Sequence, residues 1–163
     1  MKALWLLLGV CALSGLAGAQ TPQTPFVYRG NGYGFTNVGV CIHGYGFVGG
    51  GGGGEVLVYK GLSVGGEGSY NTFNDGWQIG TLTGQVGYHF GDRKKRFGMD
   101  PFFTGGIGGA FSRRNGRMGA SGNAGGGGTY WFKERVGLRF EGRALYVNRG
   151  ELIVVGRIGV SFR

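Results

Sequence analysis

The segment 136–147 (VGLRFEGRALYV) alternates between two kinds of residue, and this alternation limits the fold more than any other feature of the sequence. Arg139, Glu141 and Arg143 occupy every second position, and the residues between them are apolar or glycine. The segment 152–163 repeats the pattern. Successive side chains of a β-strand point to opposite faces. Each segment therefore predicts a strand with charges in the middle of one face and an apolar opposite face.

The same period of two recurs from residue 32 onward, interrupted by turn signals. Seven breaks are predicted: Gly44–Phe47, Lys60–Gly61, Asn74–Gly76, Gly91–Asp100, Arg113–Gly122, Lys133–Arg135 and Asn148–Glu151. They divide the chain into about eight strands of about ten residues, which is the size of a small outer-membrane barrel. The predicted fold class is all-β: a single antiparallel up-and-down transmembrane β-barrel. We expect its lipid-facing residues to include Leu138, Phe140, Leu152, Val154, Ile158 and Val160.

Glycine is far more abundant than in ordinary domains, with 41 residues among 163. Aromatic residues make up 14% of the chain, which is unlike a disordered glycine-rich linker, and charged residues make up only 15%. The interior of an eight-stranded barrel is just wide enough for side chains. We therefore interpret the runs Gly49–Gly54 and Gly125–Gly128 as strand wall. The alternative is that Gly49–Gly52 form a mobile hairpin loop.

The N-terminus has the three parts of a secretory signal peptide: a positive start, an apolar core and a small-residue cleavage site. We predict a signal peptide over 1–19, cleaved between Ala19 and Gln20, then an N-terminal extension over 20–31 and the barrel over 32–163. Cys41 is then the only cysteine of the mature chain, so no intramolecular disulfide can form. No other stretch is apolar enough for a transmembrane helix. An exported chain of this kind can still enter a membrane as a closed barrel.

Four stretches resemble the small OmpA-like outer-membrane barrel proteins, and in particular their glycine-rich, largely uncharacterised members. The stretches are 52–70 (GGGEVLVYKGLSVGGEGSY), 100–111 (DPFFTGGIGGAF), 125–143 (GGGGTYWFKERVGLRFEGR) and 156–163 (GRIGVSFR). The resemblance implies that the final strand carries an assembly signal, here Phe162, with Arg163 as a departure from an aromatic last residue. It also implies that an Arg/Glu network acts in the lumen as a plug or slow gate.

The charges predicted to face the lumen are the candidate functional site. They are Glu55, Glu67, Arg139, Glu141, Arg143 and Arg157. Every aspartate is assigned to a loop or turn. A hairpin centred on Gly61 places Glu55 opposite Glu67, and one centred on Gly150 places Arg143 opposite Arg157. Because buried charges need partners, we expect the carboxylates to meet the guanidinium groups across the narrow interior.

Other activities have weaker support in the sequence. His89 is expected to be a lumen residue bonded to its neighbours, and with His43 and Cys41 it makes no convincing metal set. We expect no enzyme activity and no cofactor. The alternatives are an outer-leaflet lipid-modifying enzyme and a soluble secreted β-barrel binding protein.

The predicted role is structural, in envelope integrity, with a plugged or narrowly gated lumen in the outer membrane of a Gram-negative type envelope. The expected partners are outer-membrane lipid, lipopolysaccharide and the assembly machinery. The net charge of +9 resides partly in the turn Arg93–Arg96 and in a loop with Arg113, Arg114 and Arg117. Such basic segments can bind anionic head groups. No nucleic-acid partner is expected, and we expect a monomer.

Overall fold

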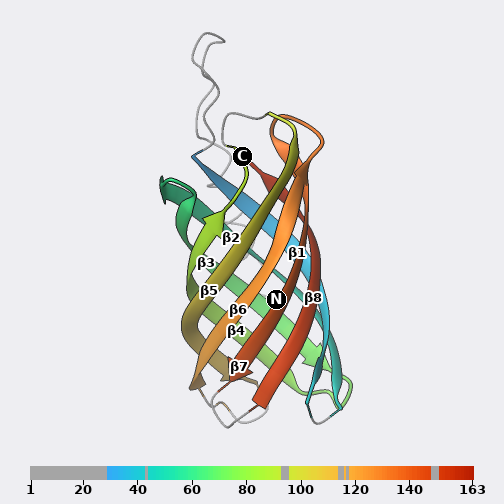
Figure 1. The fold of residues 1–163 in the computed structure, drawn as a ribbon. Coiled ribbons are helices and arrows are strands. Elements are labelled where there is room, and N and C mark those ends of the chain that lie inside the picture. The colour runs from blue at the N-terminus through green and yellow to red at the C-terminus, as the bar shows by residue number, and fades with distance from the viewer. Residues whose placement is uncertain (1–28, 43, 93–95, 114–115, 117, 148–150) are drawn as a thin grey trace, which may run out of the picture.

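The computed structural model of the chain describes residues 29–163 apart from 43, 93–95, 114–115, 117 and 148–150. Within them, eight antiparallel β-strands close into one barrel, with β8 paired to β1 (Figure 1). The strands are β1 (Gly30–Cys41), β2 (Gly46–Tyr59), β3 (Leu62–Phe73), β4 (Gln78–His89), β5 (Gly98–Ser112), β6 (Met118–Trp131), β7 (Val136–Val147) and β8 (Glu151–Phe162). The predicted up-and-down barrel is confirmed.

Two predictions concern the N-terminal part of the chain. The predicted signal peptide, with Ala19 and Gln20, lies outside the described residues. β1 begins at Gly30, so it includes two residues that the sequence assigns to the N-terminal extension. No helix with the length and hydropathy needed to cross a membrane occurs among the described residues.

The two ends of the barrel are distinguished by the strands that begin and end there. β1 starts and β8 finishes at one end, which also holds the turns β2–β3, β4–β5 and β6–β7; we call it the termini end. It lies at the top of Figure 1, where the C-terminus is marked. The other four connections lie at the opposite end, which we call the distal end.

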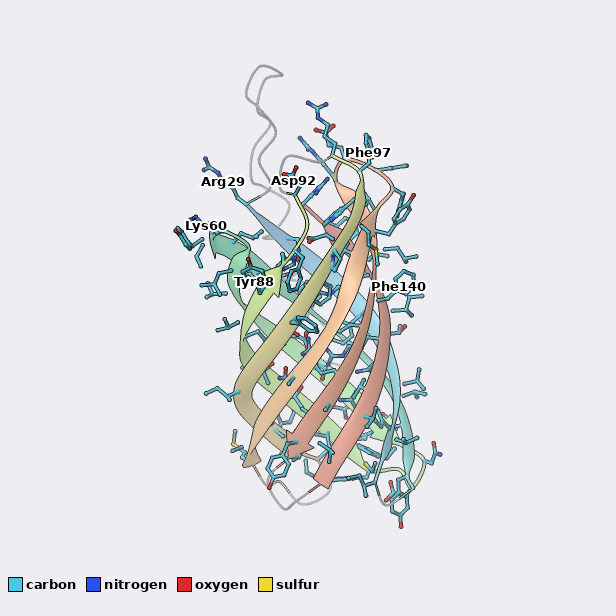
Figure 2. The ribbon with its side chains drawn as sticks, in the orientation of Figure 1. Arg29, Lys60, Tyr88, Asp92, Phe97 and Phe140 are labelled. Carbon is cyan, nitrogen blue, oxygen red and sulfur yellow. The ribbon has the colours of Figure 1, made fainter. Side chains whose placement is uncertain are left out.

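The two faces of the wall follow the alternation in the sequence. On β7, Arg139, Glu141 and Arg143 are buried in the lumen, while Phe140 is exposed on the outer face. Figure 2 shows Phe140 projecting away from the barrel. On β8, Leu152, Val154, Ile158 and Val160 are exposed in the same way. On both strands the inner row thus carries the charged side chains, and the outer row is apolar or glycine.

The register of the β2–β3 hairpin differs from the prediction. Lys60 and Gly61 both have positive φ, at 36° and 95°, as a two-residue turn of the type favoured in hairpins requires. The register also shifts at a bulge between Leu57 and Tyr59. Glu55 therefore pairs with Gly65 and Glu67 with Gly53, so the predicted Glu55–Glu67 opposition is wrong.

The β7–β8 hairpin requires a similar correction. Val147 pairs with Glu151, so the pairing is centred one residue before Gly150. Arg143 consequently faces Val155, and Arg157 faces Glu141. The predicted Arg143–Arg157 opposition is wrong, and an opposite-charge pair takes its place on neighbouring strands.

Four strands begin inside a predicted break. They are β2 at Gly46, β5 at Gly98, β6 at Met118 and β8 at Glu151. Glycine-rich sequence looks like a turn signal, but in this chain it continues the ladder, because each glycine still donates and accepts backbone hydrogen bonds.

Both glycine runs are strand wall, as predicted, and Gly49–Gly54 form no hairpin loop. A Cβ atom at Gly51 would strike the Gly68 carbonyl oxygen and the Phe35 ring. A Cβ at Gly53 would strike the Tyr33 ring in the same way. These inward glycines allow close approach of neighbouring backbone and leave room for large inward side chains.

Substitution of an inward glycine should therefore cost more than substitution of an outward one. We predict that Gly51→Ala lowers the free energy of unfolding by about 1–3 kcal/mol, because the new methyl group overpacks the lumen. Gly34→Ala is the matched control, since its Cβ would have no neighbour nearer than 3.9 Å. It should be neutral or stabilising by about 0.4–1 kcal/mol. Denaturant unfolding in lipid vesicles measures both, and equal losses would contradict the assignment of the two faces.

Candidate functional site

The lumen contains all six predicted charged residues, and the structure joins them in one network. They come from four strands: Glu55 from β2, Glu67 from β3, Arg139, Glu141 and Arg143 from β7, and Arg157 from β8. All are buried apart from Arg157, which is partly buried. Their charges therefore act on one another with little screening by solvent.

Arg143 occupies the middle of this network. Its Nη1 lies 3.0 Å from Glu67 Oε1, and its Nε donates to Glu141 Oε1 at 2.8 Å. Nη2 also contacts Glu141 Oε1 and donates to Thr104 Oγ1 at 3.4 Å. The side chains of Arg143, Glu67 and Glu141 are only 1–2% exposed. One guanidinium group thus binds two carboxylates from different strands.

Glu67 is shared by a second arginine. Arg157 Nη1 lies 2.7 Å from Glu67 Oε1, and the Tyr33 hydroxyl donates to Glu67 Oε2 at 3.2 Å. The Arg157 guanidinium carbon lies 4.3 Å from the centre of the Phe35 ring, within cation–π range. Both oxygens of Glu67 are therefore engaged.

Arg139 links the middle of the lumen to the termini end. Its Nη1 lies 3.1 Å from Glu55 Oε1, and its Nε lies 3.6 Å from Glu141 Oε2. The guanidinium carbon lies 4.2 Å from the centre of the Tyr33 ring and 3.9 Å from the centre of the Phe102 ring. Two aromatic rings and two carboxylates thus hold this cation in place.

Glu55 extends the network to His89. It accepts hydrogen bonds from Asn31 Nδ2 at 3.0 Å and from Ser63 Oγ at 2.9 Å. His89 Nε2 lies 3.1 Å from Glu55 Oε2, and His89 Nδ1 lies 2.9 Å from Asp100 Oδ2. The imidazole is thus held between two carboxylates, beside the Phe102 ring.

The assignment of every aspartate to a loop or turn is wrong for Asp100. This residue lies in β5 and is buried in the lumen. In the sequence analysis, Asp100 is the last residue of the predicted break Gly91–Asp100. The alternation of side chains could have identified it. Asp100 lies two residues before Phe102 and four before Thr104, which both point inward, so Asp100 is on the same face.

The buried charges nearly balance. The network contains four carboxylates (Glu55, Glu67, Asp100 and Glu141), three guanidinium groups and His89. Because an unpaired buried charge is strongly destabilising, these eight groups depend on one another for the stability of the interior. A change of one charge affects several partners.

The distal end of the lumen is apolar. Its buried cluster consists of Cys41, Phe47, Phe73, Ile79, Ala110, Leu145, Ile153 and Val155, with Trp77 and Val147 packed against it. The Phe47 and Phe73 rings are 5.1 Å apart. Sequence analysis did not identify this layer. The layer includes Cys41, which therefore lies within a packed core.

Arg163 lies over the termini end of the lumen. Its Nε donates to the Glu134 carbonyl oxygen at 2.8 Å, and an Nη donates to the Arg96 carbonyl oxygen. Its guanidinium carbon lies 4.1 Å from the centre of the buried Trp131 ring. A cavity of about 20 Å³ beneath it touches His89 and Asp100, which is room for about one water molecule.

The remaining candidate residues carry no visible chemistry. Phe162 is exposed on the outer face at the end of β8, and its role as an assembly signal stays a prediction. His43 lies outside the described residues. No group of His, Cys, Asp and Glu side chains in the described part of the chain is arranged to hold a metal ion.

Comparison with solved structures shows that the fold is similar to the barrels of small outer-membrane proteins. Neisserial surface protein A matches with a TM-score of 0.68 and 11% identity, over 82% of this chain and 96% of that one. The outer membrane enzyme PagL matches with a TM-score of 0.59 and 11% identity, over 80% of this chain and 99% of that one. The N-terminal barrel domain of Pseudomonas aeruginosa OprF matches with a TM-score of 0.51 and 19% identity, over 80% and 97%.

These identities are low, so the likeness is one of fold. No protein-family model matches the sequence, and no curated protein matches it at a significant level.

Removal of one member of the network should be far more damaging than removal of a surface charge. We predict that Glu67→Gln lowers the free energy of unfolding by about 3–5 kcal/mol, because Arg143 and Arg157 lose a shared partner in a buried site. Asp75→Asn is the control, since Asp75 lies in the exposed β3–β4 connection. The double reversal Glu67→Arg with Arg143→Glu should restore part of the loss. Equal stability of Glu67→Gln and Asp75→Asn in denaturant unfolding would contradict the network.

Proposed function

We propose that the protein is an exported outer-membrane barrel with a closed lumen and a structural role in the cell envelope. Its signal peptide is cleaved, the assembly machinery inserts it, and both termini face the periplasm. Its surroundings are outer-membrane lipid and lipopolysaccharide, and it acts as a monomer without a cofactor. The network of Arg139, Arg143 and Arg157 with their carboxylates is the observation that carries this proposal.

The outer face supports residence in a membrane. Its exposed side chains are largely apolar in the middle of the wall, as at Leu82, Ile107 and Ile158. Aromatic residues such as Tyr88 and Phe97 are exposed near the termini end, as Figure 2 shows. An apolar band between aromatic girdles is the outer surface that transmembrane barrels present to lipid.

Two layers in series support a closed lumen. Ion pairs occupy the middle, where Glu67, Glu141 and Arg143 have almost no exposed area. The apolar cluster around Phe47 and Phe73 occupies the distal end. An ion that crossed the barrel would have to displace both layers. The proposed plug therefore consists of a polar part and an apolar part, and the second is additional to the Arg/Glu network that the sequence indicates.

The environment of His89 supports a role without catalysis. An outer-leaflet lipid-modifying enzyme needs a base beside a nucleophile, within reach of lipid. His89 instead lies in the lumen near the termini end, with its side chain 2% exposed between Glu55 and Asp100.

We expect the mass spectrum of lipid A to be the same in cells with and without the protein. A mass shift that depends on His89 would favour the enzyme.

Conductance in planar lipid bilayers tests the closed lumen. We predict no conductance steps from the wild type, from Phe47→Ala with Phe73→Ala, or from Glu67→Ala with Arg143→Ala. Only the variant that combines all four substitutions should conduct, because both layers must then be breached. A heat-modifiable band on gels confirms that each variant is folded. Steps from the wild type would contradict the plug, and steps from either double variant would contradict two layers in series.

A further inference from the structure

Basic residues gather at the termini end of the barrel. Among the described residues, this end carries six of them in its turns and chain ends, against the two acidic residues Asp92 and Glu134. The six are Arg29, Lys60, Arg96, Lys133, Arg135 and Arg163. The distal connections and strand ends have, in the described part of the chain, only Arg113 against Asp75 and Glu151. In the part of the chain that the structure describes, the excess of positive charge is thus concentrated at one end.

Each turn of the termini end joins a basic residue directly to an exposed aromatic one. The pairs are Tyr59-Lys60 in the β2–β3 turn, Arg96-Phe97 in the β4–β5 turn, Phe132-Lys133 in the β6–β7 turn and Phe162-Arg163 at the C-terminus. The four aromatic side chains are 48–62% exposed on the outer face. Lys60 Nζ lies 5.2 Å from the centre of the Tyr59 ring.

This pairing fixes the depth of the cations relative to lipid. Exposed aromatic rings at the rim of a transmembrane barrel lie at the interface between hydrocarbon and head groups. A basic residue one position further toward the end of the barrel then lies at the level of the phosphate groups. Figure 2 shows Arg29 and Lys60 projecting outward from the end that also carries Asp92 and Phe97, with Tyr88 below them.

Four of these cations are open to a ligand. Arg29, Lys60, Lys133 and Arg135 are exposed, and within the described residues their side chains form no ion pair. Arg96 differs, because its Nε lies 4.0 Å from Glu134 Oε1. Arg163 differs too, because it is engaged over Trp131.

We propose that Arg29, Lys60, Lys133 and Arg135, which we call the basic rim, bind the phosphate groups of anionic phospholipids in the leaflet at the termini end. Each lysine or arginine near an anionic membrane surface raises the affinity for that surface by about fivefold. The aromatic neighbours hold the rim at that surface, so lipid rather than a soluble polyanion is the partner. This proposal rests on the proposed residence in a membrane.

Lipid retention tests the basic rim. The folded protein is placed in nanodiscs of equimolar phosphatidylglycerol and phosphatidylcholine and extracted with mild detergent, and the retained lipids are quantified by mass spectrometry. The wild type should retain phosphatidylglycerol preferentially. Lys60→Gln with Lys133→Gln should weaken this preference by about 25-fold, whereas Lys60→Arg with Lys133→Arg should keep it. Arg113→Gln removes one cation from the distal end and is the control, which should lower the preference much less.

Three outcomes would overturn the proposal. They are equal retention of the two lipids by the wild type, an unchanged preference in the glutamine variant, and an equal loss in the Arg113→Gln control. Glycerophosphoglycerol, the soluble head group, should not displace the bound lipid when the two are at equal concentration. Equal competition would also overturn the proposal, because the rim would then be a simple anion site. Failure of the wild type to enter nanodiscs would instead contradict the proposed membrane residence, so the two failures are distinguishable.

Discussion

The charged side chains inside this barrel are buried, and the rest of the structure depends on how they are paired. Carboxylates from β2, β3 and β7 meet guanidinium groups from β7 and β8, and His89 from β4 lies between Glu55 of β2 and Asp100 of β5. Most strands therefore contribute to one buried assembly. Without its partners, any of these ions would destabilise the fold by several kcal/mol.

The glycines are the counterpart of these large side chains. Arg143 faces Gly125 on β6, and Glu55 faces Gly65 on β3, and in both places a Cβ would collide with the charged neighbour. Tyr33 and Phe35, which contact the arginines, lie over Gly53 and Gly51. The run Gly49–Gly54 thus supplies, at alternate positions, space that the inward side chains of the neighbouring strand β1 fill. The apolar layer around Phe47 and Phe73 continues the same filling to the distal end.

Alternation predicted which residues of β7 and β8 face inward, because the pleat fixes parity without reference to partners. It could not predict which residues face each other. Glu55 meets Gly65 because of a bulge beside the Lys60–Gly61 turn, and a bulge leaves no mark on the hydrophobic pattern.

The sequence therefore predicted the six central charges and their pairing across the lumen, which the ion pairs of Glu55 and Glu67 confirm, but it did not predict the register of neighbouring strands or two further parts of the site. Asp100 was missed because it was assigned to the end of the predicted break Gly91–Asp100, whereas β5 already begins at Gly98. The distal layer was hidden because Leu145, Ile153 and Val155 are apolar on a face that is otherwise polar, which parity alone cannot interpret.

Charges distant in sequence pair across the lumen, as in the bond between Arg139 and Glu55, which are 84 residues apart. A double-mutant cycle with Glu55→Gln and Arg139→Met, followed by denaturant unfolding in vesicles, measures this pairing directly. The structure predicts a coupling energy of about 0.5–3 kcal/mol, and losses that add to within about 0.3–0.5 kcal/mol would contradict it.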